Sequence, residues 1–99
     1  MDPQDLRKRF ESELKNTDWK SLGPHFEKDR VLSVNESLDI IDVAIGIATD
    51  DADAVNGWVS TNKIIRPTKE EADRWLEDDC IFHFLIVQPF VLVKKLNLA

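Results

Sequence analysis

The sequence predicts a single α+β unit over residues 1–99, in which helices pack on a small mixed or antiparallel sheet. Apolar residues recur at helical spacing in several short segments, whereas β-branched and aromatic residues dominate from Cys80 onward. The length of 99 residues, with 42% hydrophobic and 32% charged residues, is typical of one soluble globular fold. We expect an N-terminal helix, a strand over 31–34, helices over 38–48 and 51–61, a strand over 63–66, a helix over 69–78, and strands over 80–87 and 90–95.

The N-terminal helix is expected to begin at Asp2-Pro3, because aspartate caps helices and proline suits the first helical position. Its inward face carries Leu6, Phe10 and Leu14. Thr17 then predicts the cap of a second short turn, which Gly23-Pro24 should end because proline disfavours a helical residue before it. The β-branched residues of 31–34 predict the first strand.

The segment 38–48 is apolar enough for a strand or a helix, and its polar and small residues favour a helix. These residues recur every three to four positions: Asp39, Asp42, Gly46 and Thr49. The buried side would then carry Leu38, Ile41, Ile45 and Ala48. Asp50-Asp51 breaks the pattern and caps the next helix, which Asn62 ends in a left-handed conformation. One face of that helix carries Ala52, Val55, Trp58 and Val59.

The last third of the chain combines a helix with two strands. Pro67 ends the strand 63–66, and Thr68 and Glu71 form a capping box that opens a helix. The helix should place inward Ala72, Trp75 and Leu76. In the following strand Phe82, Phe84 and Ile86 share one face, and Ile81, Leu85 and Val87 share the other. Pro89 marks a bulge, a kink or an edge position.

A strand, two helices joined by a tight turn, and a further strand follow one another in the order of a winged-helix fold. In a DNA-binding version, the first residues of the second helix would contact bases. Here these residues are Asp50, Asp51 and Asp53, and neither helix carries a positive side chain to bind phosphates. We therefore disfavour nucleic-acid binding.

The net charge of −6 is concentrated in one segment. Between Val31 and Asn62 there is no Lys, Arg or His, and the six acidic residues are Glu36, Asp39, Asp42, Asp50, Asp51 and Asp53. Of the 19 acidic residues, the remaining 13 are balanced by 13 basic ones. The segment is therefore either a solvated acidic face or a surface that recruits a basic partner. We expect nothing to offset the negative charge of its two helices.

No residue pattern indicates catalysis, a metal or a cofactor. A lone cysteine, Cys80, excludes an internal disulfide, and it cannot meet His83 because residues three apart on a strand point to opposite faces. Asp51-Ala52-Asp53 lacks the rest of a calcium loop. We predict no catalytic residue, no metal and no cofactor. An enzyme that uses the acidic segment 36–53, acting on a small molecule or with a divalent metal, stays as the alternative.

The apolar run from Cys80 to Val93 is too short to span a membrane, and no secretory signal follows Met1. These features predict a cytoplasmic protein. The run is apolar on both faces over 81–87, so this strand is either covered on both sides or shared with a second chain. The leading hypothesis is a non-catalytic interaction module that forms a homodimer through its C-terminal strands and binds a further partner of basic character. The candidate contact residues are Trp58, Arg66, Leu85, Val87, Gln88 and Phe90.

Several segments resemble an uncharacterised bacterial family, domain of unknown function 2288. They are 38–44 (LDIIDVA), Ile47-Ala48, Asp50-Asp51, Val55, Trp58, 66–68 (RPT) and, most specific of all, 85–93 (LIVQPFVLV). The likeness covers about Trp19 to Val93, and Asn62 stands where glycine is usual. The resemblance implies a small cytosolic protein and brings no activity, cofactor or catalytic residue.

Overall fold

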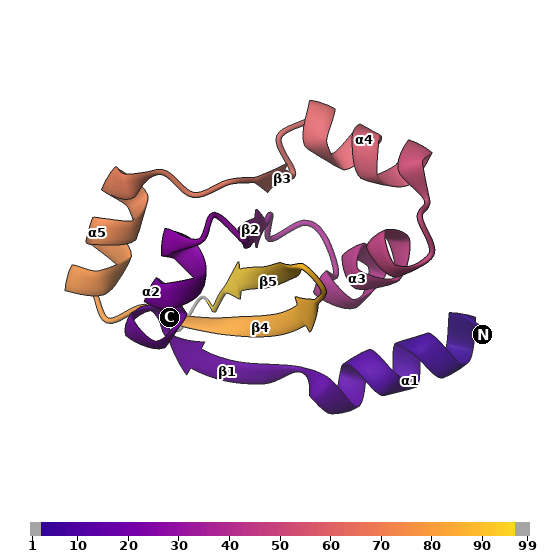
Figure 1. The fold of residues 1–99 in the computed structure, drawn as a ribbon, viewed down its shortest axis with the longest axis horizontal. Helices are drawn as coiled ribbons and strands as arrows, with labels where there is room; N and C mark the ends of the chain where they lie inside the picture. Colours follow the sequence, from indigo (N-terminus) through magenta and orange to yellow (C-terminus); the bar gives the residue numbers. More distant parts are fainter. Residues whose placement is uncertain (1–2, 97–99) are drawn as a thin grey trace.

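A five-stranded mixed sheet carries helices on both of its faces in the computed structural model, which describes residues 3–96 (Figure 1). The strands are β1 (Lys15–Asp18), β2 (Val31–Val34), β3 (Ile64–Ile65), β4 (Ile81–Val87) and β5 (Phe90–Lys95). The helices are α1 (Pro3–Glu13), α2 (Trp19–Glu27), α3 (Ile40–Ala48), α4 (Ala52–Ser60) and α5 (Lys69–Glu77). The strand order is β1-β4-β5-β2-β3; β2 and β5 run parallel, and the other pairs are antiparallel. The predicted α+β class is confirmed.

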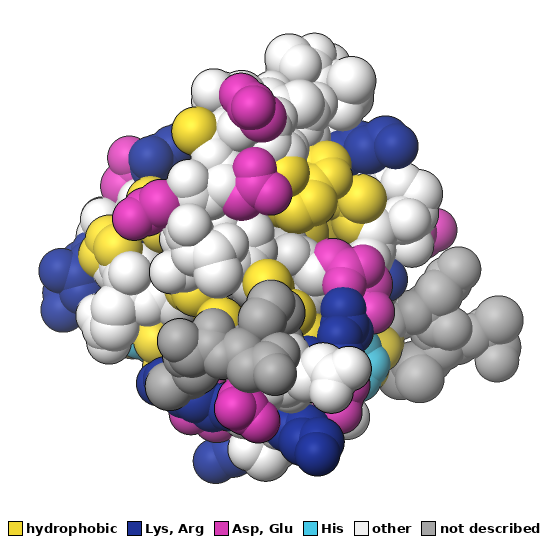
Figure 2. Space-filling model, turned by 90° about the vertical axis from the view of Figure 1, so that its right-hand side faces the viewer, with side chains coloured by type: hydrophobic (Ala, Val, Ile, Leu, Met, Phe, Trp, Pro, Cys, Tyr) yellow, Lys and Arg dark blue, Asp and Glu magenta, His cyan; other side chains and the backbone are white. Residues whose placement is uncertain are grey.

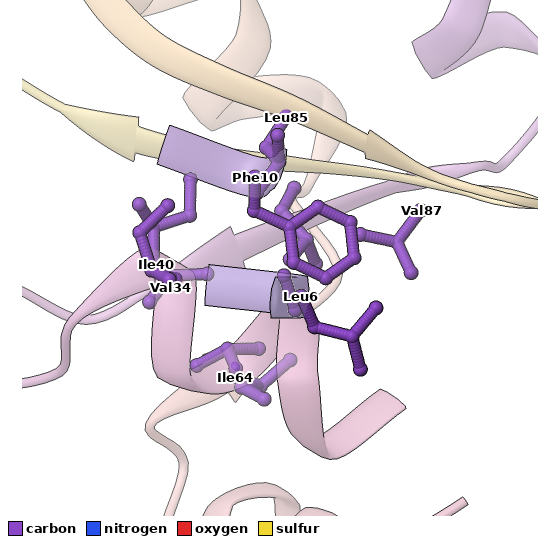
Figure 3. Packing of buried hydrophobic residues seen from close by; sticks show 11 residues of the cluster. Leu6, Phe10, Val34, Ile40, Ile64, Leu85 and Val87 are labelled. Carbon is purple, nitrogen blue, oxygen red and sulfur yellow. The ribbon is translucent and has the colours of Figure 1, made fainter. Parts of the chain in front are cut away.

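The helices α1 and α3 pack on one face of the sheet. Leu85 of β4 lies opposite Leu92 of β5, and both are almost fully buried beneath these two helices. Figure 3 shows Leu6 and Phe10 of α1 beside Val87 in this cluster. The other buried members are Val34, Ile40, Ile41, Val43, Ala44 and Ile64.

The helices α2 and α5 cover the opposite face with an aromatic cluster. Trp19 of α2 and Trp75 of α5 pack edge-to-face with ring centroids 4.9 Å apart, and both lie against Phe82 of β4. Phe82 is completely buried. Such edge-to-face pairs add to the stabilisation that comes from burying the rings. Because Phe82 and Leu85 point to opposite faces, β4 is apolar on both sides, and each side meets helices of the same chain.

The N-terminal third differs from the sequence-based expectation in the strand β1, in the cap of α2 and at Gly23-Pro24. The segment 15–18 (KNTD) forms β1 beside β4, although it has no alternation of apolar residues. The helix α2 is capped by Asp18 instead of Thr17, since Asp18 accepts a hydrogen bond from the amide of Ser21 at 2.9 Å. The hydrogen bonds from Ser21 also lower the pKa of Asp18. The expected cap Asp2 lies outside the described residues.

Gly23-Pro24 does not end a turn but lies inside α2. Pro24 lacks the N–H that an internal helical residue donates, and this loss ordinarily disfavours a helix. The helix continues because Trp19 and Leu22 are buried and Phe26 packs against the same cluster. Tertiary packing therefore outweighs the local preference of proline.

The central elements agree closely with the predicted ones, apart from their ends and some inward faces. The helix α3 begins after Asp39, which caps it by accepting from the amide of Ile41. Ala48 is exposed, and the buried residues of α3 are Ile40, Ile41, Val43, Ala44 and Gly46. Leu76 of α5 is 50% exposed instead of inward. The left-handed terminator is confirmed at Asn62, whose φ is 58°, and so is the capping box of α5.

The elements β2, α3, α4 and β3 follow one another in the predicted winged-helix order. The likeness is limited to that order. In the described structure β2 pairs in parallel with β5, and α2 and α5 occupy the second face of the sheet.

The burial of β4 gives a direct test of the fold. Leu85→Ala is expected to lower the free energy of unfolding by about 2–5 kcal/mol, because it removes buried methyl groups and leaves a cavity. The control is the adjacent Ile86→Ala, whose side chain is 45% exposed and whose loss should cost about 1 kcal/mol or less. Urea unfolding followed by tryptophan fluorescence measures both. Equal destabilisation by the two changes would contradict this arrangement of β4.

Candidate functional site

An open groove lies between α4 and the β3 side of the sheet and encloses about 700 Å³. Its apolar lining consists of Leu32, Ile47, Ala52, Val55, Val59, Ile64, Ile65 and Phe90. Its polar lining consists of Asp50, Asp51, Asn56, Asn62 and Arg66. A volume of this size, mostly apolar with a few polar groups, is typical of binding pockets in proteins.

The groove exists because α4 stands away from the core. None of its residues is buried, and Val59 on its groove side is 51% exposed. Across the groove, Ile65 of the edge strand β3 is 38% exposed. Exposed apolar side chains that gather in one hollow are characteristic of an interaction surface.

Trp58 fixes the distance between α4 and α3. Its ring lies directly on Gly46 of α3, where a Cβ atom would come within 2.9 Å of the ring. The absence of a side chain at Gly46 is therefore what allows the two helices to approach here. Trp58 itself is half-buried against the core cluster beneath α1 and α3, and Val55 and Val59 remain free to line the groove.

The two ends of the groove carry opposite charge. At the N-terminal end of α4, Asp50 takes a left-handed conformation with φ 54°, and Asp51 caps the helix by accepting from the amide of Ala54. Arg66 directly follows β3, beyond the C-terminal end of α4. Its guanidinium donates to the carboxylate and to the carbonyl oxygen of Asp29, both at 2.8 Å.

Figure 2 views the side of the molecule on which the right-hand ends of α1, α3 and α4 in Figure 1 lie. Apolar side chains reach the surface there next to acidic ones. The acidic residues that line the groove belong to the connection between α3 and α4, where the left-handed residue and the helix cap direct the chain from one helix into the next.

Part of the acidic segment has a basic neighbour. The prediction that nothing offsets its negative charge is therefore wrong for α3. Arg7 of α1 forms an ion pair with Asp42 and lies 3.7 Å from Asp39. The hydrogen bond to Asp42 raises the pKa of Arg7, and the charges of both aspartates act in the same direction. The charge that remains without a basic neighbour is therefore concentrated at the start of α4.

The sequence was compared with known protein families and with solved structures. The sequence profile of a family described as "Protein of unknown function (DUF2288)" matches residues 5–95. The chain belongs to the DUF2288 family. It is similar to the NMR solution structure of PA1075 from Pseudomonas aeruginosa, with 27% identity and a TM-score of 0.82 over 94% of this chain and 86% of that one. No curated protein matches the sequence.

In this DUF2288 protein, the predicted contact residues separate into two groups. Arg66 and Phe90 line the groove together with Asp50 and Asp51, and Trp58 supports its wall. The remaining candidates do not join them: Leu85 and Val87 are buried at 1% and 7% exposure, and Gln88 is exposed in the turn between β4 and β5.

Sequence analysis missed the residues that define the groove walls, chiefly Val55, Val59 and Ile65. The apolar stripe of α4 was visible in the sequence, which does not say what that stripe meets. An apolar stripe looks the same whether it meets a core or solvent, so only the placement of α4 distinguishes the two cases.

The site offers binding chemistry. Among residues 3–96, no cluster of three or more His, Cys, Asp or Glu side chains is arranged to hold a metal ion. His83 has a buried Nδ1 atom without a hydrogen-bond partner. This residue lies in the middle of the sheet, opposite Lys94 of β5 and Asn16 of β1 in the strand register, and it does not line the groove. No described helix has the length and apolarity needed to cross a membrane.

The groove is expected to bind a neutral apolar dye such as Nile red, whose fluorescence rises in an apolar environment. Val59→Asp should remove most of that rise, because it places a charge on the groove wall. Leu76→Asp on α5 is the matched control, since Leu76 is 50% exposed and lies outside the groove. A similar loss of fluorescence in both variants would show that the dye binds elsewhere.

Proposed function

We propose that this DUF2288 protein is a non-catalytic protein-interaction module, and that it binds an apolar segment of a partner in the groove between α4 and β3. The observation that carries the proposal is the exposed apolar lining, above all Val59 and Ile65. Covering these side chains would remove apolar area from water, which is the main driving force of protein association.

The partner segment is expected to carry basic residues beside its apolar ones. Asp50 and Asp51 border the groove, and neither forms an ion pair with a described basic residue. Complementary charge around an apolar contact speeds association and selects among partners more than it adds affinity. The chain as a whole carries a net charge of −6, which favours basic partners in the same way.

Self-association is part of this proposal. We place the contact between the two copies at the groove and not on the faces of the C-terminal strands. Phe82 and Leu85, on opposite faces of β4, pack against helices of the same chain, so the sequence pattern over 81–87 does not require a second chain. Phe90 is the residue of the C-terminal strands that lines the groove. We therefore assign any contact made by these strands to Phe90.

The cytoplasm is the compartment that we propose, since a lone cysteine suits reducing conditions. A cation-dependent or small-molecule enzyme is not proposed. Three of the six acidic residues in the segment 36–53 already have other roles: Asp39 and Asp51 cap helices, and Asp42 pairs with Arg7.

Selection of short peptides from a random display library tests the proposal. Sequences that combine apolar residues with Lys or Arg are expected to be enriched, because they complement both the lining and the acidic end of the groove. Binding of an enriched peptide should fall at least about tenfold with Val59→Asp, as for loss of a central contact, and change little with Leu76→Asp. Enriched peptides that bind both variants as well as the wild type would refute the groove as the site.

Retention on a duplex-DNA column tests the disfavoured alternative. We expect the protein to pass through even at low salt, because Asp50, Asp51 and Asp53 would face the phosphates at the start of α4. Elution with added salt is the measurement. Strong retention at low salt that declines steeply with salt concentration would contradict the expectation.

A further inference from the structure

We infer that the occupant of the groove is a second copy of this chain, placed by a twofold axis so that the two α4 helices run antiparallel. The inference rests on the proposed function and names the partner of the same site. A twofold contact uses one surface patch on both copies, so the patch must be complementary to itself. The groove meets this requirement in its charge and in its apolar lining.

The charge of the groove reverses along α4. Asp50 and Asp51 line the N-terminal end, and Asp53 follows in the first turn of the helix. Lys63 and Arg66 follow the C-terminal end, where Asp29 offsets one of the two positive charges. An antiparallel copy would bring the acidic end of each groove to the basic end of the other, and this happens twice by symmetry. A parallel arrangement would bring like charges together.

The apolar lining also matches itself. Ala52, Val55 and Val59 lie three and four residues apart on α4, so they form one continuous stripe on the groove side. The stripe ends in the exposed Val59, and Ile65 lies across the groove from it. With α4 from each copy entering the groove of the other, each stripe would cover the partner's stripe and the partner's Ile65.

The bond between Arg66 and Asp29 does not oppose this arrangement. The Asp29 side chain is 80% exposed and that of Arg66 is 53% exposed, so the pair is solvated and weak. Arg66 also lines the groove, where it can meet a carboxylate of the second copy.

Analytical ultracentrifugation of the full chain over a micromolar dilution series tests the inference. The wild type is expected to change from monomer to dimer as its concentration rises. Val59→Asp should abolish the dimer, and Leu76→Asp, with similar exposure outside the groove, should retain it. A wild type that stays monomeric throughout the series, or a dimer that survives Val59→Asp, would overturn the inference.

A charge exchange tests the antiparallel geometry. Arg66→Glu alone and Asp50→Lys alone should each weaken the homodimer about tenfold, because two attractive pairs become repulsive. An equal mixture of the two variants should restore wild-type affinity, since both charge pairs of the mixed dimer are then attractive. A mixture no tighter than the separate variants would overturn the antiparallel arrangement. Thermal unfolding of each variant confirms that it is folded.

These measurements are separable from the test of the proposed function. A monomeric protein that still binds library peptides in a Val59-dependent manner would overturn the second copy as occupant and leave the interaction module intact. A dimer that resists Val59→Asp, together with peptides that ignore the groove, would overturn both.

Discussion

The central hairpin of β4 and β5 must be buried on both faces, and the rest of the structure depends on this constraint. Phe82 points to one side and Leu85 to the other, and both are almost completely inaccessible to water. Five short helices supply the cover, two of them principally on each face. The fifth helix, α4, does not cover a face of the sheet and stands beside it. The constraint that builds the core therefore also produces the groove.

Much of the fold was predictable because its signals are local. The capping box at Thr68, the left-handed Asn62 and the alternation of Phe82 and Leu85 each act within a few residues of sequence. The strand β1 escaped prediction because its sequence, KNTD, has no apolar pattern, and its pairing with β4 supplies what its composition lacks. The helix through Pro24 escaped for a related reason, since Trp19 and Leu22 anchor it to residues distant in sequence, such as Trp75 and Phe82.

The candidate site was predictable only in part, because a groove is a relation between distant segments. The residue types of Arg66 and Phe90 suggested contact residues, but nothing in the sequence places them in one groove with Asp50. The balance of the acidic segment was misjudged for the same reason. Arg7 is 35 positions away from Asp42, and only the packing of α1 on α3 brings their side chains together.

The contact between Trp58 and Gly46 has a mechanical consequence for α4. This helix joins α3 through Asp50 and joins β3 through Asn62, and both residues are sharp left-handed bends. Between these two joints Trp58 lies on Gly46 of α3 and packs against the core cluster beneath α1 and α3. Because none of its residues is buried, α4 is the described helix that the two cores hold least firmly.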